Sequence, residues 1–149
     1  LVTSASDMAD VVKSKAAEQD IIIMTAAVAD FCPSHPADEK IKKNDSSYES
    51  VIELERTEDI LSYLGAHKAK GQLICGFSME TQNMLENSKA KLAKKNADMI
   101  VANNLKVAGA GFGTDTNVVT LITADDCTEL EIMDKSCVAA RIMDRLLQM

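Results

Sequence analysis

Short apolar runs alternate with longer amphipathic segments along most of this 149-residue chain. The runs Ile21–Met24, Leu73–Phe77 and Met99–Ala102 contain no polar alternation, which is typical of strands buried on both faces of a parallel sheet. Helical periodicity is found over Ser6–Gln19 and Asn83–Lys95. Strands that alternate with helices predict an α/β fold, a Rossmann-like three-layer parallel sheet.

The C-terminal third predicts a different connection. Val118–Thr123 and Glu129–Met133 are expected to form an antiparallel hairpin, and Asp134 is expected to cap a last helix. The inward face of that helix is predicted to carry Val138, Ile142 and Leu146. The parallel sheet should therefore end in an antiparallel C-terminal hairpin.

Other elements are predicted from shorter signals. Val51–Leu54 alternates with glutamates and indicates a half-exposed strand, while Pro33–Ser47 is typical of a long functional loop. Thr57 is predicted to cap a helix that ends near Lys68. The first helix is expected to bury Met8, Val11, Val12 and Ala16.

The beginning of the chain lacks a signal that such folds usually carry. Leu1–Thr3 is predicted to be the tail of a strand, and a helix follows it directly. A glycine-rich phosphate turn after a complete first strand is absent. We therefore expect residues 1–149 to be a single domain whose N-terminal strand-turn-helix unit is missing.

Composition excludes some classes of function. A net charge of −7 disfavours a nucleic-acid or anionic-membrane surface, and no apolar run approaches the length of a membrane span. The four cysteines form no Cys-x-x-Cys pair, which disfavours a structural zinc site and predicts reduced thiols in the cytoplasm.

Small residues follow the first apolar run, in Ala26-Ala-Val-Ala-Asp-Phe31. They would let a ligand lie against the backbone, where Asp30 could bind a base edge, a ribose hydroxyl or a magnesium ion. The following Lys40-Ile-Lys-Lys43 could neutralise a polyphosphate, although such a run is also common on solvated surfaces.

A second basic group lies on the helix that follows the second apolar run. Lys91 and Lys95 are four residues apart, so they share one helix face and could grip a triphosphate together. A charged surface helix would have the same pattern. The rings of Phe31, Phe77 and Phe112 lie in short motifs at strand ends and loops, where they could shield a ligand or fill the edge of the core.

The glycine-rich segment Gly109–Gly113 lacks the context of a dinucleotide-binding turn, because a strand follows it. Asn103 and Asn104, with Asp115 and Asn117, are expected to fix a turn there. Triads and metalloprotease motifs are absent from the sequence.

Six motifs in order resemble those of one family of enzymes. They are Ala26-Ala-Val-Ala-Asp-Phe31, Lys40-Ile-Lys-Lys43, Thr57-x-Asp-Ile-Leu61, Gly76-Phe-x-x-Glu-Thr81, Lys91-x-x-x-Lys-Asn-x-Asp-x-Ile-Val-Ala-Asn103 and Gly111-Phe-Gly-x-Asp-x-Asn117. From about Ser6 to Leu147 the chain resembles phosphopantothenoylcysteine synthetase, or phosphopantothenate–cysteine ligase, the C-terminal domain of a bacterial flavoprotein family.

The resemblance implies a cytoplasmic, homodimeric ligase of coenzyme A biosynthesis. The carboxylate of 4′-phosphopantothenate would attack the α-phosphate of CTP, with magnesium, and cysteine would then expel CMP from the acyl-cytidylate. The residues of the first two motifs are similar to those of the bacterial members of the family, which use CTP. An ATP-dependent variant of the same ligase is the alternative. The family is often fused to a flavoprotein decarboxylase, and this domain itself would hold no flavin.

The resemblance also implies the site residues. Lys40 and the backbone of Ala27 would serve the chemistry. The nucleotide contacts would be Met24, Thr25, Ala26, Asp30, Lys40, Thr57, Glu58, Asp59, Ile60, Phe77, Lys91 and Lys95. The residues that bind any metal are not implied.

Two departures from the family pattern affect these expectations. Glu58 replaces a usual proline, which a first helical turn tolerates. The segment that binds phosphopantothenate in the family is not found in this sequence, so we expect the 149 residues alone to bind CTP without completing the reaction. A non-catalytic nucleotide-binding or assembly module is the alternative from another class, and a dinucleotide-binding dehydrogenase domain is a third.

Overall fold

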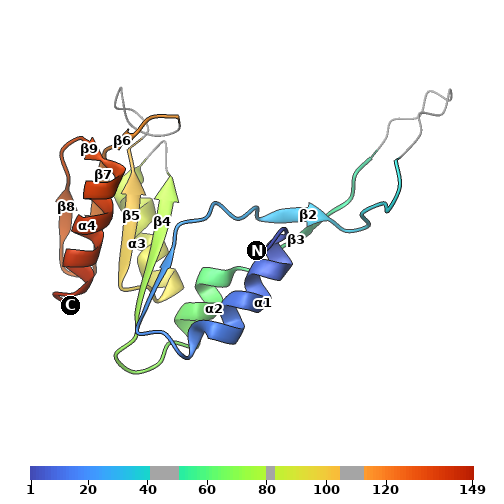
Figure 1. Cartoon of the computed structure of the whole chain (residues 1–149), viewed down its shortest axis with the longest axis horizontal. Coiled ribbons are helices and arrows are strands. Elements are labelled where there is room, and N and C mark those ends of the chain that lie inside the picture. The colour runs from blue at the N-terminus through green and yellow to red at the C-terminus, as the bar shows by residue number, and fades with distance from the viewer. Residues whose placement is uncertain (41–50, 80–82, 105–112) are drawn as a thin grey trace.

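The computed structural model describes residues 1–40, 51–79, 83–104 and 113–149. A single five-stranded sheet forms the body of the protein (Figure 1). Its strands, in spatial order, are β1 (Ile21–Met24), β4 (Leu73–Met79), β5 (Met99–Asn103), β7 (Val119–Ile122) and β8 (Cys127–Glu129).

The sheet is parallel on one side and antiparallel on the other. β1 pairs with β4 and β4 with β5 in parallel, whereas β5–β7 and β7–β8 are antiparallel. The predicted Rossmann-like α/β sheet with an antiparallel C-terminal hairpin is confirmed. β1 is an edge strand among the described residues, and it is only half-buried rather than buried as predicted.

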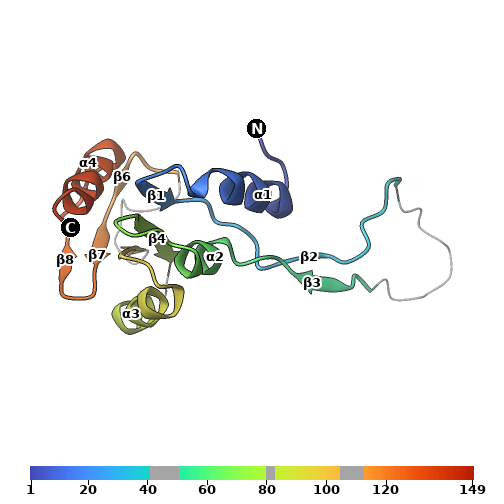
Figure 2. The ribbon, with the colours of Figure 1, turned by 90° about the horizontal axis from the view of Figure 1, so that it is seen from below.

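The helices form the two outer layers. They are α1 (Ala5–Ala16), α2 (Ile60–Ala66), α3 (Met84–Lys95) and α4 (Lys135–Leu146). In Figure 2, α3 and α4 lie on opposite sides of β7 and β8. Among the described residues, no helix has the length and apolar content needed to cross a membrane.

Alternation along the strands divides the core between these layers. Ile74 faces α1 and α2, where it packs with Ala9 and Leu64. Its neighbour Cys75 faces the other side and belongs to the larger cluster under α4. That cluster contains Cys75, Met99, Val101, Val119, Leu121, Val138, Ile142 and Leu146. The predicted inward face of the last helix is therefore confirmed.

A two-stranded arm extends away from the body (Figures 1 and 2). It consists of β2 (Phe31–Pro33), which the sequence did not predict, and β3 (Leu54–Arg56), which pair antiparallel. The predicted strand Val51–Leu54 was displaced by about two residues. Both faces of this ribbon meet solvent, so its apolar–polar alternation does not mark a buried face.

Helix starts differ from the predictions where a side chain has another partner. Thr57 does not cap α2, because its hydroxyl donates to the carbonyl oxygen of Ala29. Asp59 caps instead, accepting from the Ser62 amide at 3.0 Å, and α2 ends at Ala66, before the predicted Lys68. Asp134 does hold the N-cap position of α4, but its side chain makes no capping hydrogen bond.

The N-terminal predictions also need correction. Leu1–Thr3 is not part of a strand, and α1 begins with a capping box between Ser4 and Asp7. Val11 is 44% exposed, and Ala9 is buried in its place. Of the four residues expected on the buried face, Met8, Val12 and Ala16 pack against the core cluster.

The C-terminal hairpin turns earlier than expected. Thr123 and Asp126 close the turn, with the Thr123 amide donating to the Asp126 carbonyl at 2.9 Å. The second strand therefore begins at Cys127 and not at Glu129. A small two-stranded sheet of β6 (Thr116–Asn117) and β9 (Met133–Asp134) completes the fold.

Candidate functional site

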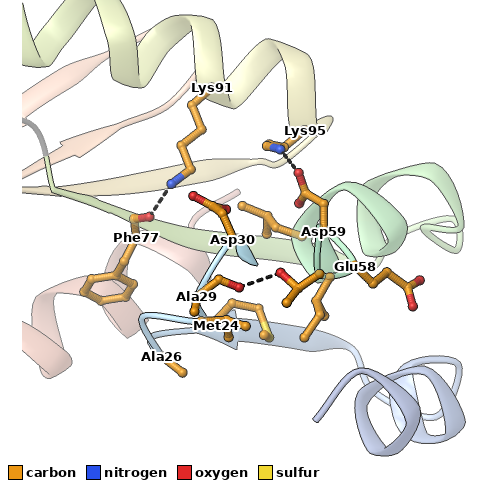
Figure 3. Close-up of a pocket in the computed structure, with 13 residues that line it drawn as sticks. Met24, Ala26, Ala29, Asp30, Glu58, Asp59, Phe77, Lys91 and Lys95 are labelled. Atoms are coloured by element: carbon orange, nitrogen blue, oxygen red, sulfur yellow. Dashed lines mark hydrogen bonds and ion pairs between the residues drawn. The ribbon is translucent and has the colours of Figure 1, made fainter. Parts of the chain in front are cut away.

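A polar pocket lies at the carboxyl ends of β1 and β4, the edge where open α/β sheets bind ligands (Figure 3). Its volume is about 200 Å³. Sites that enclose small ligands usually measure about 300–1,000 Å³, so a nucleotide bound here would remain partly exposed to solvent. The lining residues are Met24, Ala26, Val28, Ala29, Asp30, Thr57, Glu58, Asp59, Ile60, Leu61, Phe77, Lys91 and Lys95.

Strand pairing and one threonine position the first wall. Met24 ends β1 and pairs with Gly76, which places the next residue of β4, Phe77, at the same edge. The segment after β1 is held by Thr57, whose hydroxyl bonds to Ala29 and whose amide donates to the carbonyl of Asp30 at 3.0 Å. The backbone of Ala29 and Asp30 is thereby fixed against the start of α2.

The opposite wall is the face of α3 that carries both lysines (Figure 3). Lys91 Nζ donates to the carbonyl oxygen of Phe77 at 2.8 Å. Lys95 Nζ pairs with Asp59 and donates to Ser62 Oγ at 3.0 Å. The shared face predicted from the four-residue spacing is confirmed, and both ammonium groups lie at the pocket.

Two contacts between elements hold α3 in this position. A buried hydrogen bond of 2.8 Å joins the hydroxyls of Ser78 on β4 and Ser88 on α3. At the other end of the helix, the side chain of Asn96 donates to the carbonyl of Gly65 at 2.7 Å. The positions of the lysines are therefore set by packing of α3 against both β4 and α2.

Two carboxylates of the pocket have partners within the chain. Burial works to raise the pKa of Asp59, but hydrogen bonds from Lys95 and Ser62 outweigh it and hold that pKa below its ordinary value. Glu58 pairs with Lys13 of α1, and in Figure 3 its carboxylate points away from Lys91 and Lys95. Asp30, by contrast, extends toward the lysines in the same view.

Most of the predicted nucleotide contacts come together in this pocket. Ten of the twelve line it, namely Met24, Ala26, Asp30, Thr57, Glu58, Asp59, Ile60, Phe77, Lys91 and Lys95. Thr25, Lys40 and Ala27 do not line it, and all three are exposed. Lys40 lies on the segment that follows β2 of the arm, so the pocket as it stands has no contact from it.

The two phenylalanines that the structure describes, Phe31 and Phe77, do not share a site. Phe77 lines the pocket, but Phe31 lies on the arm, 49% exposed, with the guanidinium of Arg56 5.2 Å from the centre of its ring. Phe112 lies outside the described residues, as do Lys42 and Lys43 of the predicted lysine run.

Sequence reasoning missed three lining residues, Val28, Ala29 and Leu61. Each is adjacent to a predicted contact in the same motif, so the motif, rather than the single residue, was the usable signal. The predicted asparagine turn is confirmed in part, because Asn117 donates to the side-chain oxygen of Asn103 at 2.8 Å. Gly113 lies beyond this pocket, and the preceding residues 109–112 are outside the described part.

The pocket is lined by charged side chains of both signs, two lysines and three carboxylates. Among the described residues, no group of three or more His, Cys, Asp or Glu side chains could hold a metal. The four cysteines are free thiols, and burial raises the pKa of Cys75 to about 12, which keeps that thiol protonated. The charged groups that line the pocket are the ammonium groups of Lys91 and Lys95 and the carboxylates of Asp30, Glu58 and Asp59.

Comparison with known proteins shows the family of this chain. All 149 residues match the family of the DNA/pantothenate metabolism flavoprotein C-terminal domain. The coenzyme A biosynthesis bifunctional protein CoaBC of Bacillus subtilis is 47% identical over 146 residues, which are 97% of this chain and 35% of that protein. The chain thus spans about a third of the length of this curated relative.

Solved structures share the fold. The C-terminal domain of a CoaBC protein is 41% identical with a TM-score of 0.77, over 99% of this chain and 65% of that one. A Cab2 mutant in complex with phosphopantothenate-cysteine is 18% identical with a TM-score of 0.69, over 99% of this chain and 52% of that one, a likeness of fold alone. This chain belongs to the family of the DNA/pantothenate metabolism flavoprotein C-terminal domain.

Proposed function

We propose that this domain serves a ligase of coenzyme A biosynthesis that joins 4′-phosphopantothenate to cysteine with CTP. The observation that carries the proposal is the pocket, where ten of the twelve predicted nucleotide contacts come together at the carboxyl ends of two parallel strands. Membership of the family and the name of the Bacillus subtilis relative support the pathway.

The reaction would use two displacements. A carboxylate oxygen of phosphopantothenate attacks the α-phosphorus of CTP, and the bond to pyrophosphate breaks. The amine of cysteine then attacks the acyl carbon, the bond to CMP breaks, and the amine loses its proton to water. Lys91 and Lys95 would hold the β- and γ-phosphates through hydrogen bonds between charged groups, which are stronger than hydrogen bonds between neutral groups. Phe77 would shield the nucleotide.

Magnesium fits this pocket only as an ion that arrives with the nucleotide. Mg²⁺ usually keeps several waters and binds through one or two carboxylates and the substrate phosphates. Asp30 is the pocket carboxylate that extends toward the lysines, so it would meet the ion or, alternatively, a ribose hydroxyl or base edge. The ion would supply charge neutralisation of the triphosphate.

Lys40 tests the catalytic part of the proposal. Its place in the lysine motif implies a contact to the α-phosphate, which would require the segment after β2 to approach the pocket. Loss of one such electrostatic contact typically lowers the rate by about 10²–10³. We expect Lys40→Ala to do so when ligase activity is measured with the whole reading frame that encodes these residues.

A lysine far from the pocket provides the control for that variant. Lys70 is exposed in the turn before β4, so Lys70→Ala removes the same charge and should leave the rate unchanged. Equal rates for Lys40→Ala and Lys70→Ala would refute the catalytic role of Lys40.

Calorimetry separates the candidate functions. We expect CTP to bind more tightly than ATP or CMP, and NAD not to bind. Preference for ATP would indicate the ATP-dependent variant. Binding of CTP without ligase activity in the whole reading frame would favour a non-catalytic module.

Two partners belong to the same proposal. Phe31, Val51, Ile52 and Leu54 leave exposed apolar side chains on or beside the arm, and such surfaces are typical of interfaces. We therefore propose a homodimer, which light scattering would refute by a monomer mass at assay concentrations. The Bacillus subtilis relative is bifunctional, and the matching family is the C-terminal domain of a flavoprotein, which supports the proposal of an accompanying flavoprotein decarboxylase. The free thiols fit a cytoplasmic location.

A further inference from the structure

The two pocket lysines are already engaged within the chain, but by partners of different charge. Lys91 Nζ is bound to the carbonyl oxygen of Phe77, a neutral acceptor. Lys95 Nζ is bound to the carboxylate of Asp59, an anion, and to the hydroxyl of Ser62. A phosphate oxygen that approaches Lys95 must therefore displace a carboxylate that is bound to the lysine, whereas at Lys91 it would displace a neutral carbonyl oxygen.

Asp59 can leave Lys95 without leaving its place in the fold. Its Oδ1 accepts from the Ser62 amide at 3.0 Å and caps α2, while its Oδ2 faces Lys95. The Asp59 side chain is 51% exposed and that of Lys95 is 13% exposed. The capping bond at Oδ1 can thus persist while Oδ2, on a half-exposed side chain, exchanges its partner for water.

We propose that Asp59 occupies Lys95 in the nucleotide-free pocket and that the terminal phosphates of a nucleoside triphosphate displace it. Asp59 is then a positioning residue that acts through Lys95 and lowers the affinity for every ligand that needs this lysine. This inference rests on the proposed function, because it assigns the lysine end of the pocket to polyphosphate.

The exchange has a consequence for product release. Once pyrophosphate has left, no phosphate oxygen remains at Lys95, and Asp59 can bind the lysine again. A nucleoside monophosphate then has only the remaining pocket contacts to hold it. The ion pair would therefore oppose rebinding of pyrophosphate, while the affinity for the monophosphate would not depend on it.

Asp59→Asn tests the exchange without removing the cap. Asparagine is as good an N-cap as aspartate, so α2 should form as before, and the variant loses only the charge that competes for Lys95. We expect CTP and inorganic pyrophosphate to bind about 1.5-fold to fivefold more tightly, the scale of a partly exposed ion pair. CMP should bind with unchanged affinity.

A matched control and a double-mutant cycle separate this exchange from a general effect of charge. Asp126→Asn removes an ion-paired carboxylate of similar exposure, 52%, from the turn between β7 and β8, and it should not change any of these affinities. In a Lys95→Met background, Asp59→Asn should no longer raise the affinity for pyrophosphate, because the competition needs both residues.

The outcomes distinguish the two proposals. If the unaltered protein binds neither CTP nor pyrophosphate, the proposed function itself fails. If it binds them but Asp59→Asn weakens binding or leaves it unchanged, the carboxylate does not compete and the exchange is refuted. The exchange would also be refuted if Asp59→Asn raised the affinity for pyrophosphate equally with Lys95 and with Met at position 95. The effect would then come from the electrostatic field of the Asp59 carboxylate alone.

Discussion

The interior under α4 and the pocket beside α3 are built on the same sheet but from opposite kinds of residue. Under α4, Val119, Ile142 and Leu146 are at most 4% exposed, and the cluster contains no charged side chain. In the pocket, Lys95 and Asp59 are held by one another rather than by apolar packing. The first region stabilises the fold through burial of apolar side chains. The second contains charged side chains that can interact with a ligand, and it is less well packed.

This difference predicts that the two regions respond to mutation in separate measurements. A large-to-small change under α4 should lower stability and leave the ligand affinity of the folded protein unaltered. A change of charge in the pocket should alter affinity and leave stability nearly unaltered, since partly exposed ion pairs contribute little to folding.

Ile142→Ala should give the largest effect on stability. It removes a buried side chain from the middle of α4, and such changes cost about 2–5 kcal/mol through lost burial and the cavity left behind. Urea unfolding would measure it, with Val11→Ala as the control. Val11 is 44% exposed, so its loss should stay within about 0.5 kcal/mol. Similar losses from both variants would contradict the division of the core.

Gly65→Ala should have a smaller effect on stability than Ile142→Ala. Unlike the other variants, it should lower stability and ligand affinity together. A Cβ at this buried position of α2 would meet the backbone carbonyl of Lys95, so α2 and α3 would have to move apart. Overpacking of this kind costs about 1–3 kcal/mol. Because the displaced residue is Lys95 itself, CTP binding should weaken in the same variant.

A second glycine provides the comparison for that test. At Gly76 an added Cβ would meet the flexible side chain of Leu61 and that of Ile100, which can adjust more easily than a backbone. We therefore expect Gly76→Ala to cost less than Gly65→Ala in urea unfolding. The reverse order would show that α2 and α3 are not held at the distance described.

The regular part of the fold was readable from the sequence because burial there is periodic. The run Met99–Ala102 and the inward positions of α4 were predicted and are buried. The arm was not, since in a two-stranded ribbon with both faces in solvent the pattern around Leu54 carries no information about a core. Capping at Asp59 was missed because the competing bond from Thr57 to Ala29 is a long-range contact.

The candidate site was predicted through ordered motifs rather than through chemistry at single residues. Spacing placed Lys91 and Lys95 on one face, and the structure brings them to the pocket. Spacing could not show that Asp59 already holds one of them, because that pair joins residues 36 positions apart. The place of Lys40 during catalysis likewise depends on a segment that does not reach the pocket in this structure.

The most direct test of the account compares CTP with CMP in the Lys91→Gln/Lys95→Gln double variant. Charge-assisted hydrogen bonds contribute about 1.5–3 kcal/mol each, and we assign both lysines to the β- and γ-phosphates, which CMP lacks. Calorimetry should therefore show CTP weakened by at least about tenfold, with CMP nearly unaffected. Equal weakening of both nucleotides, or no weakening of CTP, would contradict the assignment of this pocket to a nucleoside triphosphate.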